Sequence, residues 1–567
     1  MRVGFSLALL CVTAPALAQE QPGTVACAGQ RIDSIVVDAR APTVTRLQRV
    51  PLIGNAVREA HVVTRERVIQ NFLELQPGDR CTELRRAESE RILRAQPFLA
   101  DASVDAVPND RGGVDLRVQT IDEASVILSV SPAGGSPAIR GARLGSSNLG
   151  GLGVHASAGW RFQRHFNDRL ELRLTDYQFM GLPYVLSLLT YRDPLSRDDR
   201  AEIMWPFRTD LQRFAWRAMI GESRTHALFT ERDSGKLALE YRREQGEVGG
   251  LARVGPPGAL SIVGVSLTTE RTTPDSIRRV TDLGLFGDTA VGFSGRFNGS
   301  HASRVNMLLG VRGIRFMRVR GLDALRGTHD VPMGIQLGGL VGRGVELFGA
   351  SSNDLLVAGE VYVGLGNPRQ TYRLQGQSEA RRTVGERQWD GMVTSGRIAR
   401  HSRVSDRHSR ALAVEWSAAH RVRVPHSLTL EAPDGGLRGY RGATSVGARR
   451  LIGRLDESVY VGSPFDFGDL GLAAFADAGR LWAGDLPYGG TTELRGSVGA
   501  SMLLAIPMRS TRTWRLEYAV PLNRVPGASR WEIRLTHRDL TSFFWREPAD
   551  VAAARARAVP VSVYNWP

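Results

Sequence analysis

One arginine stands out among the residues whose types and spacing could do chemistry. Arg438 lies between two stretches that form turns, Asp434-Gly435-Gly436 before it and Gly439 after it. Glycine allows backbone conformations in which a loop doubles back on itself. A guanidinium that such a loop carries into an interior needs a carboxylate, because an unpaired buried charge is costly. The surroundings of Arg438 therefore predict an acidic partner for its guanidinium.

The usual motifs of catalysis and metal binding are absent. The sequence contains no Gly-x-Ser-x-Gly elbow, no His-Glu-x-x-His helix, no Gly-x-x-x-x-Gly-Lys loop and no Cys-x-x-Cys pair. Its eleven histidines are scattered. We expect no enzymatic activity, no cofactor and no metal site, although a hydrolase with dispersed Ser, His and Asp residues stays open.

The N-terminus has the features of a secretory signal peptide. Arg2 precedes an apolar run, and Ala16-Leu17-Ala18 supplies the small residues of a cleavage site, so residues 1–18 would be removed. The mature chain then keeps two cysteines, Cys27 and Cys81, in a compartment that permits disulfides. Either they form a disulfide or they are two buried thiols.

Composition and charge narrow the class of protein. The 567 residues are 42% hydrophobic and 23% charged, which is typical of a folded chain and not of a disordered one. The formal net charge is +15, and Lys236 is the only lysine. A secreted chain rarely meets nucleic acid, and no zinc-finger spacing or basic helix is present, so we expect lipid head groups as the counter-charge and no nucleic acid.

Residues 27–123 differ from the rest of the chain. A short strand at 31–37 precedes two amphipathic helices, which Pro77-Gly78 separates. Alternating strands at 102–107 and 114–121 follow around a Gly-containing turn. The expected order is β-α-α-β-β, a small α+β domain.

Residues 124–545 contain no convincing helix but many segments of alternating polarity. In Arg169–Thr175, for example, leucines alternate with charged residues. A soluble sandwich would give the same alternation. Charges of both signs on the polar face and aromatic residues near strand ends favour a transmembrane antiparallel β-barrel. Residues 546–567, rich in Ala and Arg, are expected to form a tail outside that barrel.

Several motifs carry a resemblance to a known family. Residues 72–79 and 97–102 with the two closing strands resemble a polypeptide-transport-associated (POTRA) domain, and the rest resembles the BamA/TamA-type outer-membrane assembly-factor superfamily, also called the bacterial surface antigen family. The motif Leu437-Arg438-Gly439-Tyr440 matches the family's Val-Arg-Gly-Phe/Tyr sequence. Phe475-Ala476-Asp477-Ala478-Gly479 matches its Phe-x-Asp-x-Gly strand, and residues 497–522 match the hairpin that follows.

The resemblance implies a fold and a set of site residues. It implies about sixteen strands, five of them after the Arg-Gly motif at about 446–461, 470–482, 495–506, 512–520 and 530–540. It also implies that Arg438 lies on a loop inside the lumen. Alternation places Phe475 and Asp477 on the luminal face of one strand and Asp456 on that of the preceding strand. We expect Asp477 as the first partner of Arg438 and Asp456 as the second.

The function implied by the resemblance is passive handling of polypeptides. A weak seam between the first and last strands would part and offer an unpaired edge to a client strand. We expect that seam to join the Gly-rich stretch 141–153, with Gly150 and Gly151 at its turn, to the strand with Trp531, Ile533 and Leu535. The Gly-rich stretch is equally compatible with a flexible linker.

The expected location is the outer membrane of a Gram-negative-type bacterium, with the POTRA-like domain in the periplasm. The expected partners are unfolded outer-membrane or secreted polypeptides, lipid and lipopolysaccharide, and periplasmic accessory proteins. Two alternatives remain, a secretion pore dedicated to one passenger protein, and a passive channel or barrel enzyme.

Overall fold

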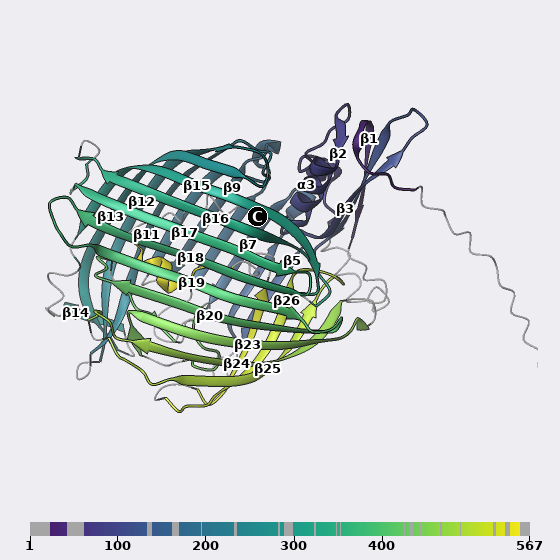
Figure 1. Cartoon of the computed structure of the whole chain (residues 1–567). Helices are drawn as coiled ribbons and strands as arrows, with labels where there is room; N and C mark the ends of the chain where they lie inside the picture. Colours follow the sequence, from purple (N-terminus) through teal and green to yellow (C-terminus); the bar gives the residue numbers. More distant parts are fainter. Residues whose placement is uncertain are drawn as a thin grey trace, which may run out of the picture.

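The computed structural model divides the chain into a small N-terminal α+β domain and a large closed β-barrel (Figure 1). The structure describes residues 23–41, 62–132, 139–161, 169–193, 196–231, 235–281, 284–288, 297, 299–322, 325–346, 349–351, 353–424, 426–430, 435–441, 445–464, 468–487, 489–525, 529–538 and 545–555. The predicted signal peptide lies outside these residues. Among the helices in the described ranges, none is long and apolar enough to cross a membrane.

The N-terminal domain is a four-stranded sheet with two helices. Its elements are β1 (Ala28–Arg40), α2 (Glu66–Gln70), β2 (Arg80–Thr82), α3 (Glu83–Arg94), β3 (Leu99–Pro108) and β4 (Val114–Asp122). The sheet order is β2-β1-β4-β3, with β1 parallel to β4 and β3 antiparallel to it. The expected β-α-α-β-β order is therefore confirmed, with the three-residue β2 added to it.

The core of this domain is apolar and cross-linked. Ile32 of β1, Ile69 of α2 and Leu93 of α3 are fully buried against the sheet, and burial of such side chains stabilises by about 1.5–3 kcal/mol each. A disulfide joins Cys27 to Cys81 across 54 residues of chain, with the two Cα atoms 4.9 Å apart. A cross-link over a loop of this length stabilises by about 4 kcal/mol, chiefly by restricting the unfolded chain.

The barrel wall is antiparallel throughout the described residues. Its strands are β5 (Val126–Pro132), β6 (Ile139–Ser146), β7 (Val154–Arg161), β8 (Arg169–Asp176), β9 (Val185–Asp193), β10 (Ser196–Trp205), β11 (Phe214–Glu231), β12 (Gly235–Val254), β13 (Leu260–Thr281), β14 (Gly284–Asp288), β15 (Ser300–Arg320), β16 (Thr328–Gly344), β17 (Asp354–Asn367), β18 (Gln370–Thr383), β19 (Asp390–Arg403), β20 (His408–His420), β23 (Arg449–Gly462), β24 (Asp469–Trp482), β25 (Arg495–Ala505), β26 (Thr513–Pro521) and β27 (Glu532–Arg538). Strand β27 lies next to β5, which closes the barrel.

The barrel class is confirmed, but the strand number exceeds the expected sixteen or so. Within the described residues the closed order contains twenty-one strands, of which β14 pairs only with the end of β13. The five strands expected after the Arg-Gly motif are present as β23–β27. The excess lies before the motif, where residues 126–205 alone form six short strands, β5–β10. The expected number rests on the resemblance, and alternation alone cannot separate wall strands from hairpin extensions.

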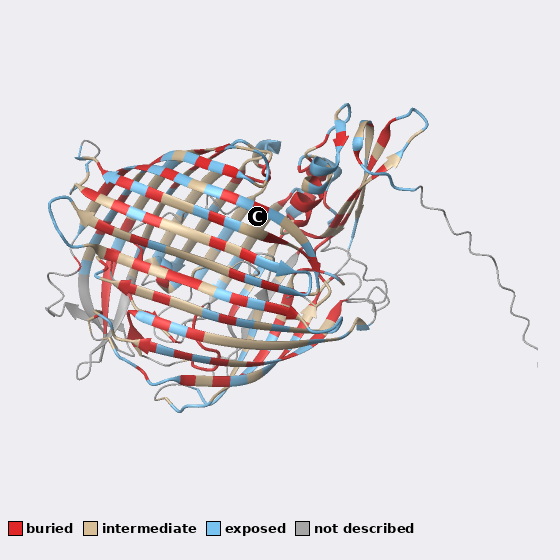
Figure 2. Cartoon of the chain, viewed as in Figure 1, coloured by how far each residue is buried: buried red, intermediate tan, exposed pale blue. Residues whose placement is uncertain are grey.

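The two faces of the wall differ in polarity, and burial alternates along the strands (Figure 2). On β13, Val263, Val265 and Leu267 face outward and are 44–65% exposed. On the inner face, Arg243 of β12 pairs with Glu270 of β13, and both are buried. The wall therefore has an apolar exterior and a charged, mostly neutralised interior.

The N-terminal domain is docked against one end of the barrel (Figure 1). Arg94 of α3 forms a two-pronged ion pair with Asp330 at the start of β16, at 2.8 Å for both nitrogen–oxygen pairs. Arg91 donates a hydrogen bond of 2.5 Å to the carbonyl oxygen of Arg208, in the turn between β10 and β11. Domain and barrel are thus held together by buried charged groups and not only by the connecting chain.

The connection from β4 to β5 is also buried. Asp122 accepts hydrogen bonds from the backbone N–H and the hydroxyl of Thr64, and Asn148 donates to that hydroxyl at 2.7 Å. The next residue, Glu123, accepts a hydrogen bond from Ser510 in the turn between β25 and β26. Burial raises the pKa of Asp122 to about 6 and that of Glu123 to about 7.

The expectation that residues 546–567 lie outside the barrel is wrong for the part that is described. Helix α5 (Ala549–Ala554) lies inside the barrel, where it is visible as the short yellow helix behind β18 and β19 (Figure 1). Val551 and Ala554 are fully buried there. A high arginine content is typical of a solvated tail, but inside the barrel Arg555 forms ion pairs with Glu379 and Glu547.

Substitution of Glu123 by glutamine is expected to change the pH dependence of stability. The pKa of Glu123 rises from 4.5 to about 7 on folding, so between these values the folded state holds a proton that the unfolded state has lost. Stability of the wild type therefore falls as pH rises through this window, by about 3 kcal/mol in total. Glu123→Gln, which mimics the protonated acid, should be the more stable protein at pH 8 and equal to wild type near pH 4.

Thermal unfolding of the purified protein in detergent, followed by circular dichroism at several pH values, measures this difference. Asp110→Asn, at the exposed turn between β3 and β4, serves as the control and should not alter the pH profile. A Glu123→Gln profile parallel to that of wild type across pH 4–8 would contradict the assignment.

Candidate functional site in the barrel lumen

The candidate site is built on the loop between β20 and β23. This loop includes the short strands β21 (Leu428–Thr429) and β22 (Val446–Gly447), which pair with each other. The β15–β16 turn lies beside the N-terminal domain, and successive wall strands run in opposite directions. The loop that follows β20 therefore leaves the barrel at the end opposite the N-terminal domain. It nevertheless carries Leu437, Arg438 and Tyr440 to positions with at most 3% exposure. The loop therefore folds back into the lumen.

Arg438 contacts carboxylates on three different strands. Its Nε donates to Oδ2 of Asp477 on β24 at 2.7 Å, and one terminal nitrogen donates to Oδ1 of the same residue at 2.5 Å. The other terminal nitrogen lies 2.9 Å from Asp456 on β23 and 3.4 Å from Glu517 on β26. The structure thus brings Arg438 together with both predicted partners and with one more.

The guanidinium also lies on an aromatic ring. The central carbon of the Arg438 guanidinium is 3.6 Å from the centroid of the Phe475 ring. Phe475 stands directly across from Gly499 on β25, and a Cβ atom at that glycine would come within 2.3 Å of the ring. Glycine at position 499 therefore leaves the space in which Phe475 lies, and Phe475 covers one face of the cation.

The neighbours of Arg438 in the motif fix the loop from both sides. Leu437 packs over Gly479, where a Cβ atom would lie 3.0 Å from a Leu437 methyl carbon. Gly439 has a φ of +87° and donates its N–H to Glu532 of β27 at 2.8 Å. The hydroxyl of Tyr440, which is fully buried, donates to the carbonyl oxygen of Gly496 at 2.7 Å. All four motif residues therefore contact wall strands.

Further arginines complete a balanced network around this site. Arg454 donates to Asp477 at 3.2 Å, and Arg515 to Asp456 at 2.9 Å. Arg534 of β27 donates to Glu517 at 3.0 Å. Positive and negative charges thus alternate across β23, β24, β26 and β27, which limits the cost of placing them in a narrow interior.

Glu517, Arg515 and Arg534 were not predicted as members of the site. Their positions could have been found, because Arg515 and Glu517 alternate with Trp514, Leu516 and Tyr518 and so share a face. What the sequence lacks is any sign that this face meets Arg438 rather than another part of the lumen.

The residues predicted for the seam divide into two groups. Trp531, Ile533 and Leu535 face outward on or just before β27, with exposures of 38–47%, and β27 does adjoin the first strand. Gly150 and Gly151 do not lie there, and this part of the prediction needs correction. They do form a turn, with φ values of +62° and +72°, but this turn joins β6 to β7 and does not lie at the junction of β27 with β5.

That turn packs against the N-terminal domain instead. The N–H of Arg65 donates to the carbonyl oxygen of Gly151 at 3.0 Å. A Cβ atom at Gly151 would lie 2.4 Å from the carbonyl oxygen of Val63, so only glycine allows this approach. The first barrel strand is β5, and its sequence contains no glycine.

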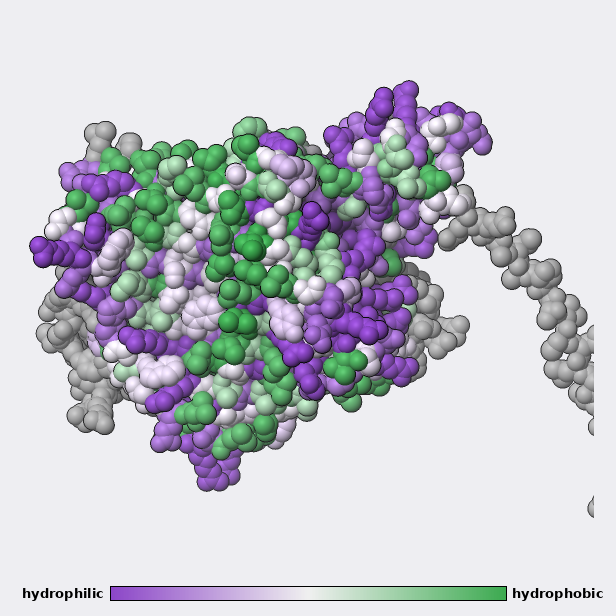
Figure 3. Space-filling model, viewed as in Figure 1, coloured by the Kyte–Doolittle hydropathy of each residue, from purple (hydrophilic) through white to green (hydrophobic). Residues whose placement is uncertain are grey.

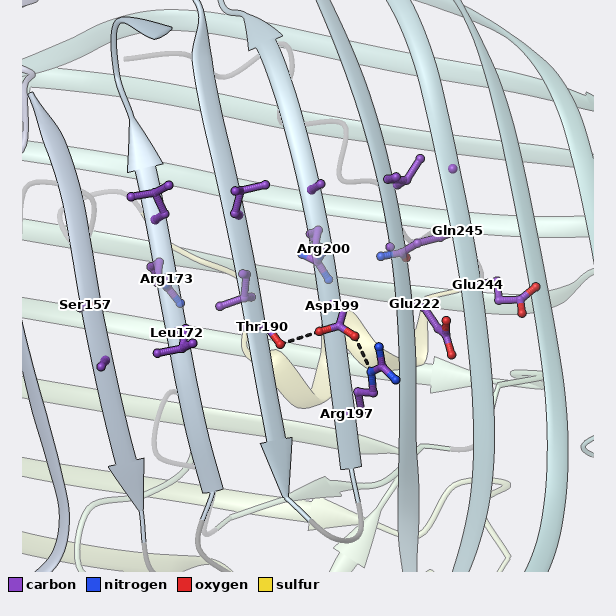
Figure 4. A pocket seen from close by; sticks show the side chains of 18 of the residues that line it. Ser157, Leu172, Arg173, Thr190, Arg197, Asp199, Arg200, Glu222, Glu244 and Gln245 are labelled. Carbon is purple, nitrogen blue, oxygen red and sulfur yellow. Dashed lines mark hydrogen bonds and ion pairs between the residues drawn. The ribbon is translucent and has the colours of Figure 1, made fainter.

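An open hollow of about 1260 Å³ lies along the wall strands β6–β13 (Figure 4). It is lined by Asp199, Glu222 and Glu244, which stand in register across β10, β11 and β12 on the same outward face as Ile220. Arg242 lies 3.1 Å from Glu222 and 2.9 Å from Glu244. The hollow is therefore an open part of the outer wall in which apolar residues lie beside a row of charged ones.

Within the ranges that the structure describes, no group of three or more His, Cys, Asp or Glu side chains is placed to hold a metal ion.

Comparison with known proteins gives similarities of structure only. No family model and no curated protein matches the sequence. The chain is similar to CdiB from Escherichia coli, with 13% identity, a TM-score of 0.41, and coverage of 94% of this chain and 93% of that one. It is similar to CdiB from Acinetobacter baumannii, with 12% identity, a TM-score of 0.39, and coverage of 84% and 74%. For BamA from Haemophilus ducreyi lacking POTRA domains 1–3 the identity is 11%, the TM-score 0.37, and the coverage 90% and 84%.

Replacement of Arg438 by alanine is expected to destabilise the barrel by about 3–5 kcal/mol, because it leaves buried carboxylates without their shared cation. Arg438→Lys should recover only part of this loss, since an ammonium cannot bind two carboxylates in the planar geometry of a guanidinium. The temperature at which the purified barrel loses its fast-migrating folded form in SDS gels measures the effect.

A double-mutant cycle with Asp477→Asn isolates the ion pair. Because Asp477 faces Arg438 with two hydrogen bonds, the double variant should be more stable than the sum of the two single effects implies. Arg173→Ala serves as the control, because the Arg173 side chain is 45% exposed where it pairs with Glu171. Its loss should lower stability by under about 1 kcal/mol. Additive effects of Arg438→Ala and Asp477→Asn would contradict direct coupling.

Proposed function

We propose that this protein is an outer-membrane β-barrel that inserts or translocates other polypeptides. Client strands would pair at the junction of β27 and β5, without nucleotide hydrolysis. The observation that carries the proposal is the contrast between this short junction and the fixed luminal loop beside it.

The polarity of the outer wall supports a membrane location. Apolar residues gather on the outside of the barrel between hydrophilic residues at its two ends (Figure 3). Val265 and Ile220 are 65% and 69% exposed. Contact of such apolar side chains with water is unfavourable, and a lipid environment would remove that contact. Along β11 the outward face changes from Ile220 to Glu222, so the charged row in Figure 4 marks one limit of the apolar band.

The length of the two strands at the junction supports opening there. In the residues that the structure describes, strands β5 and β27 have seven residues each, whereas β12 and β13 have 20 and 22. Fewer residues allow fewer inter-strand hydrogen bonds, each worth about 1 kcal/mol net. An edge of β27 freed in this way would present its outward row, Trp531, Ile533 and Leu535, as the template beside which a client strand adds its own apolar face.

The luminal network supports a fixed β27 side of this junction. Glu532 and Arg534 of β27 are bound to Gly439 of the loop and to Glu517 of β26. Separation of β5 from β27 would therefore leave the last strand supported from inside. The N-terminal domain, at the other end of the barrel from the loop, would lie in the periplasm, where polypeptides and accessory proteins reach it, with lipid and lipopolysaccharide around the wall.

A secretion pore for one passenger protein is the second candidate. It is favoured by the presence of non-wall segments, the β20–β23 loop and α5, inside the lumen. Such segments could move without loss of the wall, which would open a path through the barrel instead of between strands.

A disulfide across the junction is expected to abolish insertion of client proteins. Ile533 and Leu535 of β27 are exposed on the outer face, so Ile533→Cys or Leu535→Cys, combined with a cysteine at each position of β5 in turn, identifies the pair that forms this cross-link. The oxidised variant should fail to support assembly, and a reductant should restore it. Met502→Cys with Leu516→Cys, a pair in register between β25 and β26, is the matched control and should stay active.

Depletion of the protein followed by quantitative outer-membrane proteomics separates the two candidates. A loss of many barrel proteins is expected for an assembly role, and a loss of a single surface protein for export. An unchanged outer-membrane proteome would overturn both.

A further inference from the structure

The segment that follows the last barrel strand is the least expected feature of the structure. Its described part, residues 545–555, lies in the lumen and contacts wall strands that are far apart in the barrel order. Arg243 of β12 donates to the carbonyl oxygen of Arg555 at 2.6 Å, and the side chain of Arg555 donates to Ser395 of β19 at 3.0 Å. Strands β13 and β15–β18 separate β12 from β19 in the wall, so the segment lies across the lumen.

The segment is held by charged groups at both of its ends. At the start of α5, Asp550 accepts hydrogen bonds from Arg450 of β23 at 2.6 and 3.1 Å. After α5, Arg555 lies 3.3 Å from Glu379 of β18 and 2.7 Å from Glu547 within the segment itself. Arg450, Glu379 and Arg555 have side-chain exposures of at most 3%. These ion pairs fix the position of the segment inside the barrel.

The apolar contacts of the segment are small by comparison. Val551 and Ala554 belong to one buried cluster with Leu237 of β12, Val393 of β19 and Leu437 of the luminal loop. A helix of six residues has little stability of its own. The segment thus depends on its binding site for its conformation, and the wall strands pair with one another without it.

The segment also meets the luminal loop. Arg450 donates to the carbonyl oxygen of Thr429 at 2.6 Å as well as to Asp550, so one arginine binds both elements. A Cβ atom at Gly435 would come within 2.5 Å of Pro548, which shows how closely the loop and the segment approach. Loop and segment together fill a part of the lumen that neither fills alone.

We infer that the barrel lumen contains a peptide-binding site whose resident ligand is this chain's own C-terminal segment, and that binding of this segment closes the pore. The ligand class is a short helical peptide with a carboxylate in its first turn, small apolar residues in the middle and an arginine after its last turn. Release of the segment would let water hydrate Arg450 and Glu379 and would leave the wall in place. The inference rests on the proposed membrane location of the barrel, but it is independent of whether clients are inserted or exported.

Removal of residues 546–567 is expected to raise the conductance of the purified protein in planar lipid bilayers severalfold. The matched control ends after Arg555, which retains every contact described for the segment and should conduct as the full chain does. A synthetic peptide of residues 546–567, added to the truncated protein, should lower the conductance again. The same peptide with Asp550→Ala and Arg555→Ala should not.

Flotation of proteoliposomes is measured in parallel, so that entry into lipid is known independently of conductance. If full-length and truncated proteins both fail to enter lipid, the proposed membrane function fails. If both enter lipid and conduct equally, the inference about the segment is overturned and the proposed function stands.

A second variant tests the inference even if the truncated chain does not fold. Ser395 contacts Glu547 directly, so Ser395→Cys with Glu547→Cys can fix the segment in the lumen by a disulfide. The oxidised double variant should show fewer openings than its reduced form, with wild type under the same reductant as the control. Equal opening of the oxidised and reduced forms would contradict a movable segment.

Discussion

The ion pairs of Arg438 are the interaction on which the rest of the structure depends. A guanidinium in a narrow lumen is tolerable only with carboxylates on several sides, and Asp477, Asp456 and Glu517 supply them from three strands. These contacts fix a loop that leaves the far end of the barrel and returns into it. They also fix the mutual position of β23, β24 and β26. Because β27 is bound to the same network, one side of the barrel closure is supported from within.

The other side of the closure, strand β5, is linked directly to the N-terminal domain. Strand β5 follows directly from Glu123 and the N-terminal domain, and that domain is attached to the barrel end through Arg94 and Asp330. A displacement of the domain would therefore move β5 through the covalent chain. It would also move the β15–β16 turn through the ion pair between Arg94 and Asp330. The closure thus joins β5, which is linked to the N-terminal domain, to β27, which is bound to the luminal network.

Alternation of polarity made part of the site predictable. Period-2 spacing is enough to place Phe475, Asp477 and Asp456 on the luminal face, and the glycines around Arg438 indicate a loop that turns back. The same reasoning could not separate two uses of glycine. The Gly-rich stretch 141–153 suits a weak seam strand as well as a linker, and only the fold of the chain shows that its turn at Gly150 and Gly151 lies between β6 and β7.

The luminal position of α5 could not be predicted for a different reason. Six helical residues carry too little periodicity, and two of the side chains that bind the segment, Glu379 and Arg243, lie 176 and 312 positions before Arg555 in the sequence. The expected strand number rests on the resemblance and not on the pattern, because alternation alone does not show which segments belong to the wall. Local pattern thus indicated the faces of the wall but not what the interior contains.

Nearly every cationic side chain of this protein is an arginine, and this affects how the luminal ion pairs respond to alkaline pH. Guanidinium groups stay protonated at every acidity that a living cell encounters, in contrast to histidine and to readily perturbed lysine. Alkaline surroundings cannot neutralise the cationic half of the luminal network.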